Sequence, residues 1–120
     1  MEKKVPIKTD IDKFFIRYLH IVRPLLKPHL SNGELRVFSE LLRINNEYKS
    51  IKPELRGKLL FDYDNKIIIM DRLGISYNTL GNIFMALRKK GYIIGNNIKK
   101  ELAITPDKEF TISYKFVIEK

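Results

Sequence analysis

The feature that most constrains this chain is a glycine and a serine placed between two apolar-periodic stretches within residues 66–90. Gly74 closes the first stretch, where a helix commonly ends in a left-handed residue, and Ser76 stands where it can cap the next helix. The positions that two helices crossing at a tight turn must bury are all apolar: Ile69, Leu73, Ile75, Leu80 and Ile83. The spacing therefore predicts two short helices joined by a sharp turn, with Gly74 at positive φ.

The second of these helices is expected to cover residues 77–90. Its apolar stripe, spaced at three and four residues, consists of Tyr77, Leu80, Ile83, Phe84 and Leu87. The opposite face then presents Asn78, Asn82, Met85 and Lys89. In a helix-turn-helix, this outward face of the second helix enters the major groove of DNA. Gly81 lies inside the expected helix, where it costs roughly 1 kcal/mol relative to Ala.

Residues 87–94, Leu-Arg-Lys-Lys-Gly-Tyr-Ile-Ile, close this helix with three cations and a glycine before a β-branched run. Together with residues 73–76, Leu-Gly-Ile-Ser, they resemble the winged-helix DNA-binding superfamily, in which such a sequence feeds a β-hairpin wing. The resemblance covers residues 31–118 and looks closest to helix-turn-helix modules of phage and plasmid replication or regulatory proteins. It implies an α+β winged helix-turn-helix fold, with a three-helix core, an antiparallel β wing and an extra N-terminal helix. Residues 1–30 would form the N-terminal helix and connector, and residues 31–120 the winged-helix domain.

Composition and charge limit the classes of protein that fit. With 120 residues, 44% of them hydrophobic, the chain suits one packed domain, and the absence of cysteine excludes disulfides and thiolate zinc sites. The net charge is +9, and residues 66–100 hold seven cations and one anion, whereas residues 31–65 hold six of each. The excess therefore falls where a polyanion would bind. A compositional origin stays open for part of it, because 16 Lys against 7 Arg also fits an AT-rich coding sequence.

Local signals predict the elements that precede the helix-turn-helix. Asp10 can cap a first helix, which Pro24 and Pro28 end, leaving residues 23–30 as an extended connector. This helix is apolar on one face, so it either packs on the domain or docks on a partner. Residues 31–34, Ser-Asn-Gly-Glu, form a capping box for a second helix that ends near residues 45–46.

Residues 48–64 are expected to form a loop with a short helix over 53–59 and a strand over 59–61 that pairs with the wing. Residues 62–65, Asp-Tyr-Asp-Asn, offer an N-cap for a helix beginning near Lys66. Asp62 and Asp64 could be imagined as metal ligands, but the full calcium-loop pattern is absent and capping is the better interpretation.

The C-terminal part of the chain carries the period of a strand. From Phe110 to Ile118, apolar side chains alternate with others, as in a half-buried strand. Residues 101–105 are its expected hairpin partner, with the turn at 106–109, and residues 95–97 form a bend. Such a wing would place Asn96, Asn97, Lys99 and Lys100 near phosphate or a minor groove.

No pattern in the sequence indicates an active site. His20 and His29 are the only histidines and neither has a metal-binding spacing, and no phosphate-cradling loop or nucleophile elbow occurs. We therefore predict a protein that is not an enzyme and needs no cofactor or metal. Neither a secretory signal nor an apolar run of membrane-spanning length is present, so we expect a cytoplasmic protein, or a virion protein if it is phage-encoded.

The leading hypothesis is a phage or bacterial regulatory or replication-associated factor that binds duplex DNA through the helix at 77–90 and the wing. Asparagine can bond to both N6 and N7 of adenine, so Asn78 and Asn82 would reach base edges while Met85 contacts thymine methyls. Such a charge-poor helix suggests either A·T-rich sites or weak specificity. Cations would hold phosphates and supply most of the affinity. The expected interface consists of Tyr77, Asn78, Asn82, Met85, Arg88, Lys89, Lys90, Asn96, Asn97, Lys99 and Lys100.

Two other hypotheses use the same fold differently. In one, the winged helix is an assembly module, for example in a structural or connector protein of a phage virion. In the other, the chain is a dimeric transcription regulator whose N-terminal helix supplies the homo-oligomer contact, so that a two-fold pair reads half-sites about one helical turn apart.

Overall fold

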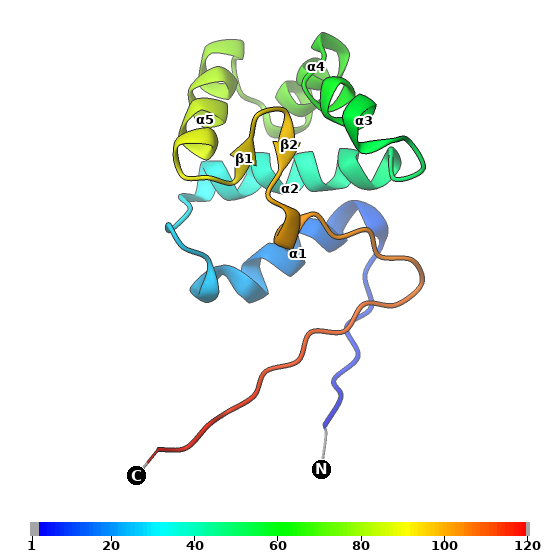
Figure 1. Cartoon of the computed structure of the whole chain (residues 1–120), viewed down its shortest axis with the longest axis vertical. Helices are drawn as coiled ribbons and strands as arrows, with labels where there is room; N and C mark the ends of the chain where they lie inside the picture. The colour runs from blue at the N-terminus through cyan, green and yellow to red at the C-terminus, as the bar shows by residue number, and fades with distance from the viewer. Residues whose placement is uncertain (1–2, 120) are drawn as a thin grey trace.

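The computed structural model of the chain describes residues 3–119, and within them five α-helices and one two-stranded antiparallel sheet (Figure 1). The helices are α1 (Ile11–Val22), α2 (Asn32–Glu47), α3 (Pro53–Leu60), α4 (Tyr63–Leu73) and α5 (Tyr77–Lys89). The strands are β1 (Ile93–Ile94) and β2 (Asn97–Ile98), and two 3-10 turns are η1 (Arg23–Leu25) and η2 (Lys100–Leu102). The fold is therefore α+β, with helices predominating.

Side-chain caps begin four of the helices where the sequence predicts them. Asp10, Ser31, Asp62 and Ser76 each accept a hydrogen bond from the backbone N–H three residues later. Ser31 also takes part in the predicted capping box, because its own N–H donates to the Glu34 carboxylate at 2.9 Å. Helix α4 begins at the residue after Asp62, three residues earlier than expected, since Asp62 rather than Asn65 supplies the cap.

Helix α2 is the centre of the molecule. Helix α1 packs along one side of it, and α3, α4 and α5 lie on the other (Figure 1). Burial from two sides explains why α2 is covered almost all round, including Glu40 and Arg43, which form an ion pair at 3.3 Å. The apolar face of α1 packs on the domain, because Phe15 and Leu19 belong to the same buried cluster as the core of α2.

The β-hairpin follows α5 directly and is very short. Ile93 pairs with Ile98 and Ile94 with Asn97, and Gly95 in the turn has a φ of 64°. Tyr92, just before β1, is buried, packs edge-on against Phe38 and donates a hydrogen bond from its hydroxyl to the Pro28 carbonyl. The predicted bend at residues 95–97 is thus the tip of this hairpin.

Several of the expected strands are wrong. Leu59 and Leu60 end helix α3, so residues 59–61 form no strand, although the short helix predicted there is confirmed. Residues 101–105 begin inside the 3-10 turn η2 and offer no ladder for a partner. Residues 110–118 are extended but unpaired, because the strand that should have paired with them does not form. The connector 23–30 is only partly extended, since it begins as η1.

The two extended segments lie at the same end of the molecule. The segment before α1 and the segment after η2 both run away from the helices past α1 (Figure 1). Within residues 3–119, no helix combines the length and the apolar composition needed to cross a membrane.

Candidate nucleic-acid interface

Helices α4 and α5 meet at a tight turn whose geometry is set by two residues. Gly74 has φ 65° and ψ 40°, the left-handed conformation that glycine adopts without cost, and its N–H donates to the Met70 carbonyl at 2.8 Å. Ser76 then caps α5 through the Thr79 N–H at 3.1 Å. Only residues 74–76 separate the two helices, and Ile69 and Leu80 are buried beside this turn. The two predicted helices and the sharp turn between them, with Gly74 at positive φ, are therefore confirmed.

The outer face of α5, defined here as Asn78, Asn82, Met85 and Lys89, is exposed to solvent as the helical spacing predicts. Met85 is 67% exposed. Leu80, Phe84 and Leu87 on the opposite side are buried in the core. One helix therefore presents two amides, a thioether and an ammonium group outward.

Tyr77 is exposed at the start of α5, although the periodicity placed it on the apolar stripe. Its side chain is 52% exposed, and the Lys66 ammonium lies 5.8 Å from the centre of its ring. The buried stripe of α5 therefore begins at Leu80. Because Lys66 comes from α4, no local pattern in the sequence pairs it with Tyr77, and its place beside α5 was not predicted.

Gly81 leaves an open spot on α5. No atom of the described chain, apart from its neighbours and its own helix backbone, lies within 4 Å of where a Cβ would stand. Helical spacing puts this position next to Asn78, three residues before, and Met85, four residues after. The glycine is therefore not required for packing inside the molecule. Its lower helix propensity costs roughly 1 kcal/mol relative to alanine, and no contact within the described chain offsets that cost.

The three cations at the end of α5 have different surroundings. Lys89 is exposed, and the exposed Arg88 guanidinium lies 5.1 Å from the centre of the Phe61 ring, a cation–π contact. Lys90 is already engaged, because its ammonium donates to the Glu34 carboxylate at 2.6 Å and to the His29 carbonyl at 2.9 Å. Lys90 thus ties the end of α5 to the start of α2, and we leave it out of the phosphate-binding set that the sequence suggested.

The ion pair between Lys90 and Glu34 also affects the pKa of the Glu34 carboxyl. Burial raises the pKa of the Glu34 carboxyl, but hydrogen bonds from Lys90 and from Ser31 outweigh burial and leave the pKa below its ordinary value. The carboxylate is therefore charged at neutral pH. Its charge cancels that of Lys90, so the two together add no net positive potential near α5.

The hairpin does not extend outward as a long wing. Its tip lies against α3, since a Cβ on Gly57 would come within 2.6 Å of the Asn96 carbonyl oxygen and 3.0 Å of Asn97 Oδ1. In Figure 1 the hairpin stands between α5 and α3. Asn96 and Asn97 are exposed, but their backbone is held on α3 rather than projected along a groove beside α5.

The two remaining predicted wing cations differ in their exposure to solvent. Lys99 is half-buried with its ammonium 5.6 Å from the centre of the Tyr92 ring, whereas Lys100 is exposed in η2. Lys58, the exposed neighbour of Gly57, lies on the helix that carries the hairpin tip. The sequence did not single out Lys58, because the contact between α3 and the hairpin joins residues about forty positions apart.

In residues 3–119, no three His, Cys, Asp or Glu side chains lie close enough together to hold a metal ion. Asp62, considered above as a metal ligand, caps α4 instead. The chain matches no family model, no curated protein and no solved structure in the three comparisons made with known proteins.

Proposed function

We propose that this chain is a winged-helix protein with a shortened wing, and that it binds duplex DNA through the outer face of α5. The observation that carries the proposal is the exposed row of Asn78, Asn82 and Met85 on a helix fixed by the Gly74 turn. The major groove of DNA is wide enough to admit an α-helix, and the exposed second helix of a helix-turn-helix is the one that enters it. Nothing in the proposal requires catalysis, a cofactor or a metal.

Each group on this surface has a role in the proposal that follows from its chemistry. Asn78 and Asn82 each offer a donor and an acceptor, the pair that adenine presents in the major groove. Met85 would pack on thymine methyls. Arg88, Lys89 and Lys100 would contact phosphates, with Lys66 and Lys58 as additional cations on the neighbouring helices. We therefore expect modest affinity with a preference for A·T-rich sites.

The test is the salt dependence of binding to a mixed-sequence duplex. Removing one cation that touches a phosphate should reduce the slope of log K against log salt by about 0.9. We expect Arg88→Ala and Lys89→Ala each to lower both the affinity and this slope. Lys13→Ala, which removes an exposed cation from α1, is the matched control and should leave both unchanged. Absence of binding at low salt, or binding whose strength does not vary with salt, would contradict the proposal.

Sequence preference is tested separately on A·T-rich and G·C-rich duplexes. Asn82→Ala should cost about 1–3 kcal/mol on the preferred duplex if the amide makes a bidentate adenine contact. It should leave the salt slope intact, since asparagine releases no counterions. Equal reductions in affinity for both duplexes would show that Asn82 does not read bases.

Exposed apolar side chains favour a second candidate, in which the same surface binds a protein subunit of an assembly such as a phage virion connector. Met85, Tyr77 and Ile94 are all more than half exposed. Removing residues 1–30 would not test this, because Phe15 and Leu19 of α1 are part of the core. Met85→Lys is the better probe, since it should strengthen non-specific DNA binding but weaken a protein contact made by the same face.

A further inference from the structure

Residues 105–119 bend at Lys108 and then run extended (Figure 1), and their backbone N–H and C=O groups make no hydrogen bonds to other backbone groups of the described chain. Among the described residues, no backbone–backbone hydrogen bond involves this stretch, the last one running from the Ile104 N–H to the Leu102 carbonyl. The side chains from Phe110 to Ile118 nevertheless alternate as in a strand. The segment therefore has the sequence pattern of a strand and lacks a neighbouring strand.

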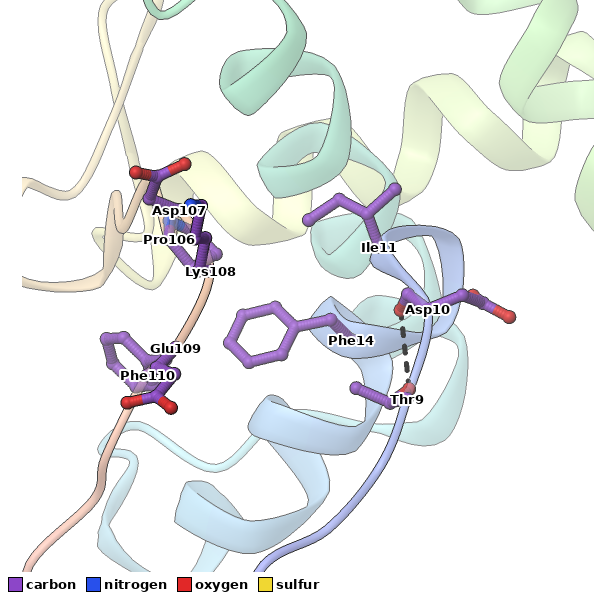
Figure 2. Close-up of a pocket in the computed structure, with 9 residues that line it drawn as sticks. All are labelled: Thr9, Asp10, Ile11, Phe14, Pro106, Asp107, Lys108, Glu109 and Phe110. Atoms are coloured by element: carbon purple, nitrogen blue, oxygen red, sulfur yellow. Dashed lines mark hydrogen bonds between the residues drawn. The ribbon is translucent and has the colours of Figure 1, made fainter.

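The first half of the segment is anchored on α1. Phe110 packs edge-on against Phe14 and Tyr18, with 5.6 Å between ring centres in both pairs. The Tyr114 hydroxyl donates to the Ile21 carbonyl at 3.0 Å. Figure 2 shows the Phe14 ring pointing from α1 toward the segment, across a cavity of about 160 Å³ between residues 9–11 and 106–110. These contacts hold residues 110–114 on the surface of α1.

The second half continues past α1 with its apolar side chains in solvent. Phe116 is 89% exposed, Val117 71% and Ile118 91%. Phe116 and Ile118 continue the same alternate row as Phe110 and Tyr114, so this row leaves the domain without changing its pattern. An unpaired apolar strand of this kind is a template for pairing with another strand.

We propose that residues 115–119 pair antiparallel with the same residues of a second copy of the chain, across a two-fold axis at Val117. In this register, Lys115 of each copy lies opposite Glu119 of the other, and Phe116 lies opposite Ile118. Opposite charges and apolar pairs directly across a ladder are stabilising, and a two-fold axis makes each pair occur twice. Because the segment is complementary to itself in this register, the partner strand is that of a second copy of the chain.

Other two-fold registers fit less well, beginning with an axis at Phe116, which would set Lys115 against Val117 and Glu119 against Ser113. An axis at Lys115 would set the two lysines against each other, and an axis at Tyr114 would set Glu109 against Glu119. A slip of one residue would place the apolar row of one copy on the polar face of the other. The register at Val117 is the one that pairs both charged residues of the segment with opposite partners.

Charge exchange at these two positions tests the pairing and its register by sedimentation of the full chain over the micromolar to millimolar range. We expect the wild type to form dimers. Lys115→Glu alone and Glu119→Lys alone should each weaken the dimer about tenfold, because each sets like charges opposite one another twice. An equimolar mixture of the two variants should form heterodimers of wild-type strength, and the double variant K115E/E119K should recover homodimers.

Substitutions of two exposed apolar residues provide a second test and its matched control. Phe116→Lys should abolish dimerisation over the same range, whereas Leu55→Lys, at a residue of α3 that is 54% exposed, should leave it unchanged. Both residues lie outside the core, so circular dichroism should show the same helix content in each variant. A wild type that stays monomeric, single charge variants that dimerise like the wild type, or a mixture that does not recover would each overturn the proposal.

Discussion

The α4–α5 unit and the segment 105–119 differ in where their backbone hydrogen bonds are made. The two helices complete their bonds from their own residues, and Asp62, Gly74 and Ser76 satisfy their ends. The segment, within the described residues, makes no backbone bond to another part of the chain. The difference teaches that a helix is specified by consecutive residues, whereas a strand stays incomplete until a second strand is supplied.

Side-chain packing follows the same division. Leu80 of α5 is 1% exposed, while Phe116 of the segment is 89% exposed. Each is a large apolar side chain, and only the first contributes to the folded domain through burial. Substituting each of the two side chains by alanine and comparing the free energies of unfolding therefore distinguishes the two regions.

The largest expected effect is that of Leu80→Ala. Removing a fully buried leucine side chain should lower the free energy of unfolding by about 2–5 kcal/mol. Phe116→Ala should change it by less than about 0.5 kcal/mol, because nothing in the described part of the domain covers that ring. Urea denaturation followed by circular dichroism measures both, at a concentration low enough to keep the chain monomeric. Similar destabilisation by the two substitutions would show that the Phe116 ring is packed into the domain.

The sequence predicted most of what is local. Four side-chain caps, the left-handed Gly74 and the exposure of Asn78, Asn82 and Met85 follow from spacings of one to four residues. The strand over 110–118 could not be assigned correctly in the same way. Its period is genuine, but the period says nothing about whether a partner strand exists in the same chain.

The errors at the candidate site have the same physical origin. Lys90 meets Glu34 across 56 positions of sequence, and the hairpin tip meets Gly57 across about forty. Nothing near Lys90 indicates that a buried carboxylate neutralises it. Nothing near Asn96 indicates that a glycine of α3 makes room for its carbonyl. Pairings at such distances depend on the packing of α2 and α3, which the local patterns do not determine.

Two glycines within helices compare a position whose substitution is limited by a contact distant in sequence with one where only the local helix matters. Gly57→Ala should destabilise the protein by about 1–3 kcal/mol, because the new methyl group would stand 2.6 Å from the Asn96 carbonyl oxygen and displace the hairpin. Gly81→Ala should stabilise it by about 1 kcal/mol, since that position is open and alanine favours the helix. Thermal unfolding gives both signs, and amide exchange at Lys99, whose N–H donates to the Tyr92 carbonyl at 2.9 Å, reports displacement of the hairpin. Stabilisation by both substitutions would show that helix propensity alone governs these positions.

The smallest effect concerns the ion pair that joins the end of α5 to α2. Because the pKa of Glu34 is lowered in the folded protein, its contribution to stability is complete above the unfolded pKa of about 4.3. That contribution disappears as the pH falls through the lower, folded pKa. Lys90→Met keeps the apolar stem and removes the charge, so it should cost about 1 kcal/mol at pH 7 and progressively less in acid.

Lys89→Met is the matched control for this pH dependence, because Lys89 is the exposed neighbour on the same helix. We expect its unfolding free energy to follow that of the wild type across the pH range, measured by denaturant titration at several pH values. Part of the dependence should survive in Lys90→Met, since the Ser31 bonds to Glu34 remain. If Lys90→Met costs as much at pH 3 as at pH 7, the ion pair is not what stabilises this contact. The hydrogen bond from the Lys90 ammonium to the His29 carbonyl, which does not depend on the charge of Glu34, would then hold the end of α5 against the connector before α2.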